Sequence, residues 1–403
     1  MNKVVTVGLG YIGLPTSALM ANSGLKVHGV DINQKVVDTI NEGKVHIVEP
    51  ELDEAVRVAV SNGNLTADTK PVGADVYLIV VPTPFKGNHE PDISFVESAT
   101  DSIIPLLKEG DLFIIESTSP VGTTDQMKCR ILDERPELKD NISIAYCPER
   151  VLPGNIMHEL VHNDRVIGGV DKKSTEHAIR FYKGFVKGEL HSTNARTAEM
   201  CKLVENSSRD SQIAFANELS MICDLADIDV WELISLANKH PRVNILNPGS
   251  GVGGHCIAVD PYFITARFPS EAKLIATSRE VNNYKSLWCV EKIKNTISEF
   301  RITHKRSPKV ALLGLAFKPN IDDLRESPAL FIAQSIIDSY VSEETIIVEP
   351  NIDKHSSIEL KSYEYAKSRA DILVFLVGHD EFNGYKNSTQ IILDFCGITI
   401  EKY

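Results

Sequence analysis

The sequence predicts an α/β protein with two Rossmann-like doubly wound domains joined by a helical middle domain that contains a long central helix. Three observations support this fold class. Buried-strand runs alternate with helix-like stretches up to about residue 194, no strong strand pattern occurs from 195 to 300, and the alternation resumes after 301. Such alternation is typical of parallel sheets covered by helices. We therefore expect domains at 1–194, 195–300 and 301–403.

The N-terminal part begins with a β-branched run at 3–8, followed by a helix-like segment from Leu14 to Ser23. Four more runs have the composition of buried strands: Lys26–Val30, Val76–Val81, Leu112–Ile115 and Ile142–Ala145. Helix-like stretches separate most of them, so we expect a parallel, doubly wound sheet.

The middle part is predicted to be helical. Within Ala195–Ala226, one set of residues follows three- and four-residue steps or their multiples, which predicts one face of a long helix. The members of this apolar stripe are Cys201, Val204, Ser208, Phe215, Leu219, Ile222 and Ala226. The segment from Ser270 to Phe300 also has a helical pattern, and Thr303–Pro308 is a polar connector.

The C-terminal part returns to strand–helix alternation, which predicts the second Rossmann-like domain. Its strand candidates are Lys309–Gly314, Thr345–Val348 and Asp371–Val377. The two α/β ends could therefore be distantly similar units.

Composition limits the possible functions. The 403 residues carry a net charge of −13 without a long basic run, which argues against nucleic-acid or membrane-surface binding. No apolar run is long enough to span a bilayer, and the start reads as a strand rather than a signal peptide. Seven cysteines without a Cys-x-x-Cys pair favour reduced thiols in the cytoplasm and argue against structural zinc. We expect no metal.

The first chemical motif is Gly8-Leu9-Gly10-Tyr11-Ile12-Gly13, which follows a predicted strand and opens a predicted helix. Glycines in this context allow a tight turn, and the helix N-terminus faces a pyrophosphate. Asp31 ends the second strand at the distance expected of a residue that binds the adenosine ribose. Its charge would repel a 2′-phosphate, so NAD is favoured over NADP.

The second and third motifs are a helical pair and a glycine-rich loop. In Glu199-x-x-Lys202-x-x-x-Asn206, Lys202 and Asn206 share a helix face off the apolar stripe, which suits a polar cleft but is also ordinary for an exposed helix. Gly249 to Gly254 contains four glycines, which let a backbone approach a ligand, and leads to Cys256 and Asp260.

Cys256 is a candidate nucleophile. A free thiol, with a pKa of roughly 8.5, needs activation, and Lys202 with the loop amides could supply it. A Cys–His pair with His255 is a weaker option, because adjacent residues in an extended loop point apart. A turn followed by a buried small residue is the plain alternative.

The fourth motif runs from Gly314 to Pro328 and again follows a strand. Its Lys318 and Arg325 suit phosphate or pyrophosphate recognition, although a solvated charged loop would read the same way.

Together these motifs closely resemble the UDP-glucose/GDP-mannose dehydrogenase family over nearly the whole chain. The resemblance also rests on Val81-Pro82-Thr83-Pro84, Glu116-Ser117-Thr118-Ser119-Pro120-Val121-Gly122 and Cys147-Pro148-Glu149-Arg150. It implies an NAD domain, a helical middle and a nucleotide-sugar domain. It also implies oxidation of a sugar C6 alcohol to a carboxylate in two NAD-linked steps.

The resemblance assigns expected roles to residues. Cys256 would be the nucleophile, while Lys202, Asn206 and Asp260 would position a water and stabilise oxyanion charge, with Glu149 and Thr118 nearby. Cofactor contacts are expected from Gly8, Gly10, Tyr11, Ile12, Gly13, Asp31, Thr83, Thr118 and Arg325. Substrate contacts are expected from Arg150, Val151, Leu152, Lys202, Asn206, Arg242, Gly253 and Lys318. Arg242 would reach the neighbouring subunit's site, so a homodimer is implied.

The loop departs from the UDP-glucose pattern, because Val252 replaces an aromatic residue and Val259 replaces a lysine before Asp260. With His240 to Leu246 before it, this version resembles the N-acetylhexosamine branch, whose expected substrate here is UDP-N-acetyl-D-mannosamine, for bacterial surface polysaccharide synthesis. UDP-N-acetylglucosamine and UDP-glucose remain alternatives. A two-electron β-hydroxyacid dehydrogenase is the rival from another reaction class, and a non-enzymatic nucleotide-binding protein is the last rival.

Overall fold

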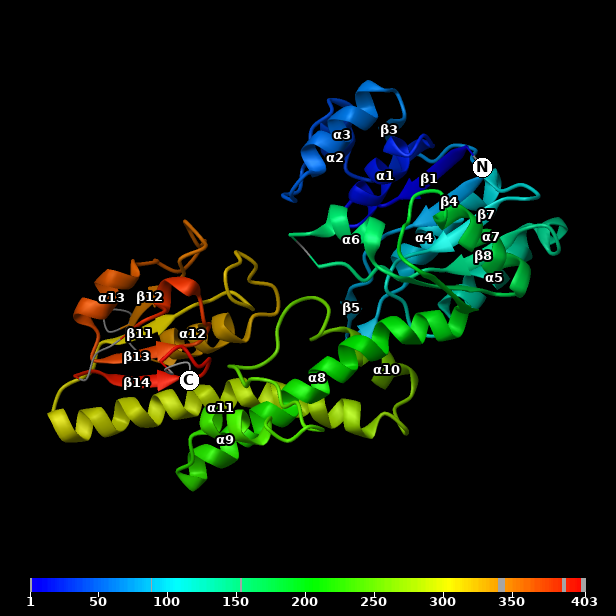
Figure 1. Ribbon diagram of the computed structural model, residues 1–403. Coiled ribbons are helices and arrows are strands. Elements are labelled where there is room, and N and C mark those ends of the chain that lie inside the picture. The colour runs from blue at the N-terminus through cyan, green and yellow to red at the C-terminus, as the bar shows by residue number, and fades with distance from the viewer. Residues whose placement is uncertain (1, 88, 153, 340–344, 386–388, 400–403) are drawn as a thin grey trace. The chain divides into compact units, whose positions relative to one another are not determined.

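The computed structural model describes residues 2–87, 89–152, 154–339, 345–385 and 389–399. The chain divides into two compact units (Figure 1). Unit 1 comprises residues 1–205 and 262–267, and unit 2 comprises residues 206–261 and 268–403. The long helix α8, Ala195–Ala226, begins in unit 1 and ends in unit 2.

Unit 1 is built on an eight-stranded sheet of order β10-β9-β8-β7-β4-β1-β2-β3. Its strands are β1 (Lys3–Val7), β2 (Lys26–Val30), β3 (Leu65–Asp68), β4 (Val76–Ile79), β7 (Leu112–Ile115), β8 (Ser143–Tyr146), β9 (Arg165–Gly169) and β10 (Leu190–Asn194). Its helices are α1 (Gly13–Asn22), α2 (Gln34–Asn41), α3 (Leu52–Ser61), α4 (Ser94–Ile103), α5 (Thr123–Glu134), α6 (Ile156–His162) and α7 (Lys172–Tyr182). A small hairpin pairs β5 (Phe85–Lys86) with β6 (Glu90–Pro91).

Helices cover both faces of this sheet because the strand residues alternate between two cores. In β4, Leu78 packs in one core with residues of α1, α3 and α7, while Tyr77 and Ile79 pack in the other with residues of α4 and α5. A strand that is buried on both faces has a continuous run of apolar residues in its sequence. The strands of unit 1 with such runs could be predicted for this reason. The chain changes direction across the sheet between β1 and β4, and in such folds ligands bind at the carboxyl ends of the strands at that point.

Unit 2 contains a four-stranded parallel sheet of order β12-β11-β13-β14. Its strands are β11 (Val310–Leu313), β12 (Thr345–Val348), β13 (Ile372–Phe375) and β14 (Ile391–Asp394). Its helices are α9 (Val230–Ala237), α11 (Lys273–His304), α12 (Pro328–Ser339) and α13 (Tyr363–Arg369), and α10 (Asp260–Arg267) starts here and ends in unit 1.

The predicted fold class is confirmed, and three strands match their predicted bounds: β2, β7 and β12. Two expectations need correction. The sheet of unit 1 is not entirely parallel, because β9 runs antiparallel to β8: the connection through α6 stays at the carboxyl edge, so β9 enters the sheet from that edge. The connector expected at 303–308 begins later, because α11 continues to His304.

Helix α8 has the predicted bounds, but its apolar stripe does not face the core of the chain. Val204, Phe215 and Ile222 are about half exposed. The buried face of α8 in unit 2 is polar instead, and it pairs with α11 (Figure 1). Arg279 donates to Asp210 at 2.6 Å, and Lys285 Nζ donates to Ser220 Oγ at 2.8 Å.

This polar seam also holds the start of the glycine-rich loop. Asn217 donates its amide N–H to Asn282 Oδ1 at 2.9 Å, and its own Oδ1 accepts the backbone N–H of Gly249 at 2.9 Å. The seam therefore joins the two long helices and positions the first residue of the loop.

In the described part of the chain, no helix combines the length and the apolarity needed to cross a bilayer.

The seam predicts a large stability effect for Asp210→Ala. Removing one partner of a buried ion pair leaves an uncompensated charge, so unfolding should become easier by about 3–5 kcal/mol. The matched control is Asp224→Ala, on the same helix pair, whose partner Lys292 is partly exposed; it should cost only about 0.2–1 kcal/mol. Denaturant unfolding of both variants checks this, and equal effects would contradict the role of the seam.

Candidate functional site

The glycines of the first motif have separate structural roles. Gly8 has φ +98°, and a Cβ there would lie 2.3 Å from the Val80 carbonyl oxygen. A Cβ on Gly13 would lie 1.8 Å from the carbonyl oxygen of Gly8. A Cβ on Gly10 would meet nothing within 4 Å. Gly8 and Gly13 are therefore required by the turn and by helix–strand packing, while Gly10 leaves open backbone over which a pyrophosphate fits.

Asp31 lies beside this loop. Its Oδ2 accepts the backbone N–H of Leu9 at 3.2 Å, and its Oδ1 accepts that of Asn33 at 2.9 Å. The carboxylate is half-buried, and each oxygen keeps a further acceptor site. These residues fit an NAD adenosine, with Asp31 placed for the ribose hydroxyls.

Glu199, the first residue of the helical motif, has a structural role. Its buried carboxylate accepts the backbone N–H of Gly122 at 2.6 Å and that of Thr124 at 2.7 Å, at the start of α5. It thus caps a helix N-terminus, where a negative charge is favourable. This cap holds the end of the loop from β7 to α5, which carries Thr118. Lys202 and Asn206 are the two residues of this motif that stay candidates for catalysis.

The structure brings Cys256, Asp260 and Asn206 together within unit 2. The Cys256 carbonyl oxygen accepts the backbone N–H of Asp260 at 2.8 Å, so the two residues are one helical turn apart at the start of α10. Asp260 is buried, and Asn206 Nδ2 donates to its Oδ2 at 2.5 Å. Lys202 lies one turn before Asn206 on α8.

Packing inside the protein accounts for two of the glycines before Cys256, and the expected approach of this backbone to a ligand stays a prediction. A Cβ on Gly253 would lie 2.4 Å from the Glu326 carbonyl oxygen, and one on Gly254 would lie 2.8 Å from the Phe317 ring. The Gly254 N–H donates to the Arg325 carbonyl oxygen at 3.1 Å. The glycines thus let the cysteine loop lie directly on the 314–328 motif.

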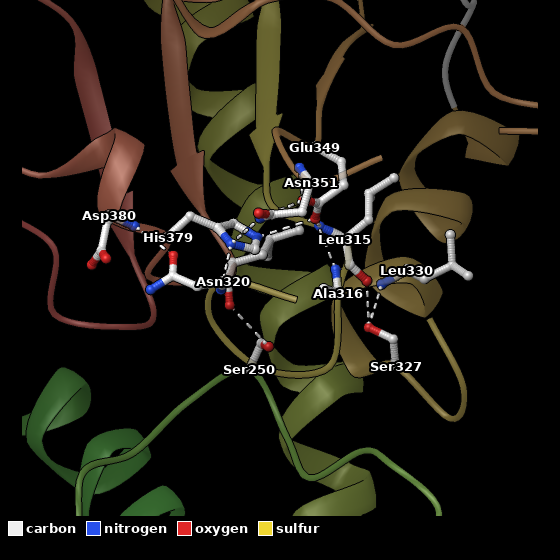
Figure 2. A network of polar contacts seen from close by, with 11 residues as sticks. Ser250, Leu315, Ala316, Asn320, Ser327, Leu330, Glu349, Asn351, His379 and Asp380 are labelled. Carbon is white, nitrogen blue, oxygen red and sulfur yellow. Dashed lines mark hydrogen bonds and ion pairs between the residues drawn. The ribbon is translucent and has the colours of Figure 1, made fainter. Parts of the chain in front are cut away.

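A buried carboxylate anchors the 314–328 motif (Figure 2). Glu349 Oε2 accepts the backbone N–H groups of Leu315 at 2.7 Å and Ala316 at 2.9 Å, and it lies 3.1 Å from His379 Nε2. His379 Nδ1 accepts the Asn320 N–H at 3.0 Å, so a proton on Nε2 faces Glu349. Burial alone would raise the pKa of Glu349, but these hydrogen bonds lower it to about 2.

Sequence analysis missed Glu349 and His379, although a signal existed for Glu349. It follows β12, the second strand of the C-terminal sheet in sequence, as Asp31 follows β2 in the N-terminal one. Both acids accept the N–H of the leucine in a Gly-Leu-Gly or Gly-Leu-Ala turn. The unit 2 acid, Glu349, is fully buried. It therefore holds the Leu315 loop and is not accessible to a ribose.

The substrate contacts expected in unit 1 lie after β8. Arg150 donates to Glu205 at 2.7 Å, Val151 is half-buried, and Leu152 is exposed. Glu49 holds the segment that follows, because its carboxylate accepts the N–H groups of Gly154 and Ile156.

Other predicted residues lie on surfaces. In unit 2, Lys318 and Arg242 are exposed, and Arg325 is paired with Asp323 at 2.6 Å. In unit 1, Tyr11 is exposed, and Thr83 and Thr118 are half-buried. Their roles stay predictions.

Glu149 forms a buried ion pair that the sequence did not suggest. Its Oε2 accepts from Arg165 at 2.6 Å and its Oε1 accepts the Arg150 N–H at 2.7 Å. Over the described ranges, the single group of residues spaced to bind a metal is Asp164, Glu189 and His191. That group is exposed and excludes Cys256 and His255.

Comparison with known proteins shows three consecutive matches to domains of one family. Residues 2–186 match the UDP-glucose/GDP-mannose dehydrogenase family, NAD binding domain; residues 196–284 match its central domain; and residues 311–400 match its UDP binding domain.

Relatives resemble the whole chain. A UDP-N-acetyl-D-mannosamine dehydrogenase of Yersinia pestis is 55% identical, covering 98% of both chains. An NDP-N-acetyl-D-galactosaminuronic acid dehydrogenase of Ralstonia nicotianae is 53% identical, covering 98% of this chain and 96% of that one. A solved UDP-N-acetyl-mannosamine dehydrogenase structure from Staphylococcus aureus is 41% identical, with a TM-score of 0.87 over 98% of this chain and 99% of that one.

The position of Asp31 predicts cofactor preference. Asp31→Ala should weaken NAD binding by roughly 10- to 100-fold, because hydrogen bonds to a charged acceptor are lost, and should reduce discrimination against NADP. Calorimetric titration of both cofactors measures this, with exposed Asp38→Ala as the control. Asp31→Asn keeps an acceptor for the Leu9 N–H, so it separates charge from loop support. Unchanged affinity and preference in both Asp31 variants would contradict the placement.

Proposed function

The chain belongs to the UDP-glucose/GDP-mannose dehydrogenase family, and on that premise we propose that it oxidises the C6 alcohol of UDP-N-acetyl-D-mannosamine to the carboxylate. It is an NAD-dependent UDP-sugar dehydrogenase. The observation that carries the substrate proposal is the 55% identity, over nearly the whole of both chains, to a relative named for that sugar.

The proposed chemistry uses the Cys256 turn. A four-electron oxidation removes two hydrides from C6, and bound NAD would supply the acceptor for each. In the first step the C6 hydroxyl proton passes to a water held by Asp260 and Asn206, whose 2.5 Å contact supports this role. Lys202, one turn away, stabilises the developing oxyanion.

Cys256 then retains the intermediate. As its sulfur adds to the aldehyde carbon, the thiol proton passes to the carbonyl oxygen, which gives a thiohemiacetal. Loss of the second hydride, which NAD would accept, and of the hydroxyl proton to the same water leaves a thioester. Water hydrolyses the thioester, which releases the acid and restores the thiol. Glu149 and Thr118 are proposed to order this water and the nicotinamide end of the site. Covalent retention explains how one site runs both oxidations without releasing an aldehyde.

Binding roles follow the same proposal. The open backbone at Gly10 and the carboxylate of Asp31 support cofactor contacts there, with Tyr11, Ile12, Thr83 and Arg325 as further contacts. For the substrate we propose Arg150, Val151, Leu152, Arg242, Gly253 and Lys318. The order of the matched family domains supports the boundaries 1–194, 195–300 and 301–403.

We propose a homodimer in which Arg242 contributes to the partner's site. The half-exposed apolar stripe of α8 supports this, because Phe215 and Ile222 would be covered by a second copy. Arg242 itself is exposed, on the segment after α9. The seven cysteines all lie in the described ranges and form no disulfide there, which supports a cytoplasmic location. A role in bacterial surface polysaccharide synthesis is part of the same proposal.

Cys256→Ser should reduce acid formation by roughly 10³-fold or more while UDP-sugar and NAD still bind, because a hydroxyl without an activating base is a poor nucleophile. NADH release and ligand titrations measure the two effects. The control is Cys129→Ser, an exposed thiol on α5. Near-normal acid production by Cys256→Ser would remove Cys256 from the mechanism.

A panel of UDP-sugars, followed by NADH release, tests the substrate. UDP-N-acetylmannosamine should be best, UDP-N-acetylglucosamine worse, and UDP-glucose barely used. A site built to bind an acetamido group leaves polar atoms unpaired when that group is missing, which can cost ~4–5 orders of magnitude.

UDP-N-acetylgalactosamine belongs in the panel because of the 53% identical relative. Two NADH per sugar support this proposal, whereas one indicates hydroxyacid-type chemistry and none indicates binding alone. Comparable specificity constants for UDP-glucose and UDP-N-acetylmannosamine would exclude the N-acetylhexosamine assignment.

A further inference from the structure

A second carboxylate is buried beside Glu149. Glu116 follows β7, Glu149 follows β8, and Arg165 opens β9. Because β9 is antiparallel to β8, its first residue lies at the carboxyl end of β8. The three side chains therefore meet at one edge of the unit 1 sheet, and Tyr182, the last residue of α7, closes the group.

Contacts link these residues in a chain. Arg165 Nη1 donates to Glu149 Oε2 at 2.6 Å, and Arg165 Nη2 donates to the Leu160 carbonyl oxygen at 3.2 Å. The guanidinium lies 5.4 Å from the centre of the Tyr182 ring, and the Tyr182 hydroxyl donates to Glu116 Oε1 at 2.5 Å. Glu116, Glu149 and Arg165 are all at least nine-tenths buried.

The group holds two carboxylates but one guanidinium. No donor from the described residues reaches Glu116 Oε2, which is buried. Two carboxylates that share one site do not both ionise easily. Burial raises the pKa of Glu116 to about 7; Arg165 opposes this shift and Glu149 adds to it.

Two other groups face Glu116. Burial raises the pKa of the Cys147 thiol to about 12 and that of the Tyr182 hydroxyl well above its usual value. Both stay neutral near pH 7, so the charge of Glu116 is the one that changes there.

We propose that Glu116 is a positioning residue for the reaction, which controls the orientation of Glu149 by sharing the Arg165 guanidinium with it. This rests on the proposed role of Glu149 in the site. When Glu116 carries a proton, Glu149 is the one carboxylate of this group that holds Arg165 by charge. When Glu116 ionises, the guanidinium has two acceptors and its hold on Glu149 weakens.

The protonation itself is tested without substrate. Infrared spectra of the full-length enzyme, recorded from pH 5 to 9, should show a buried carboxylic acid that loses its proton near pH 7. Glu116→Gln should abolish this signal, and Glu176→Gln, an exposed change on α7, should keep it. A signal that persists in Glu116→Gln would overturn the assignment, whatever sugar the enzyme uses.

The positioning role is tested by the pH dependence of kcat, with the UDP-sugar that the enzyme oxidises best. The ratio of kcat for Glu116→Gln to kcat for the wild type should rise by roughly 10-fold through pH 7, because only the wild type loses the Arg165 hold on Glu149. The KM for the sugar should stay unchanged. Comparing the two enzymes cancels titrations that they share.

Tyr182→Phe gives an independent arm if Glu116→Gln does not fold. It removes a hydrogen bond that favours ionised Glu116, so the transition should move to higher pH by about one unit. Infrared titration that behaves as expected with an unchanged kcat ratio would overturn the positioning role while leaving the proposed reaction intact. An unmoved transition in Tyr182→Phe would also overturn it.

Discussion

Hydrogen bonds from backbone amides to buried carboxylates hold the loops at the strand ends in both units. Glu199 accepts two such bonds at the start of α5, Glu49 accepts two beside α6, and Glu349 accepts two from the 314–328 motif. Loops that leave a sheet expose amides without partners, and a buried amide without a partner is costly. A carboxylate can accept charge-assisted hydrogen bonds from two amides at once. The loops that carry the proposed catalytic and binding residues are therefore held with little freedom to move.

The same constraint explains why the cysteine loop is rich in glycine. Once Glu349 has fixed the 314–328 motif, the loop before Cys256 must lie directly on it, and a side chain at Gly253 or Gly254 would overlap with Glu326 or Phe317. The polar seam between α8 and α11 holds the other end of this loop through Asn217. The loop that leads to Cys256 is thus held at both of its ends. Preorganisation of this kind is what covalent catalysis requires.

In a single chain the apolar face of a helix is expected to be buried and its polar face exposed. In the unit 2 part of α8 the polar face is buried and the apolar face is half exposed. The buried face carries Asp210, Asn217 and Ser220, each matched by a polar group of α11. The apolar residues Phe215 and Ile222 are half exposed. Burying polar groups is costly unless hydrogen bonds offset the loss of water, and an apolar stripe left open favours association. The arrangement is understandable if α8 serves two interfaces, one within the chain and one with a second copy.

The sequence by itself determined the fold class, the bounds of β2, β7, β12 and α8, and the separate pairs Lys202 with Asn206 and Cys256 with Asp260, because apolar runs, helical spacing and glycine turns are local signals. The partners of Glu199, Glu349 and Glu149 were decided by tertiary structure alone. Glu199 is 75 and 77 residues from the amides it binds, and Glu116 is 66 residues from Tyr182. No local pattern records which loop a distant carboxylate will meet, or which face of a helix finds a partner. Those outcomes depend on how the strands are ordered in the sheets, and that order buries Glu116 near the ion pair of Glu149 and Arg165.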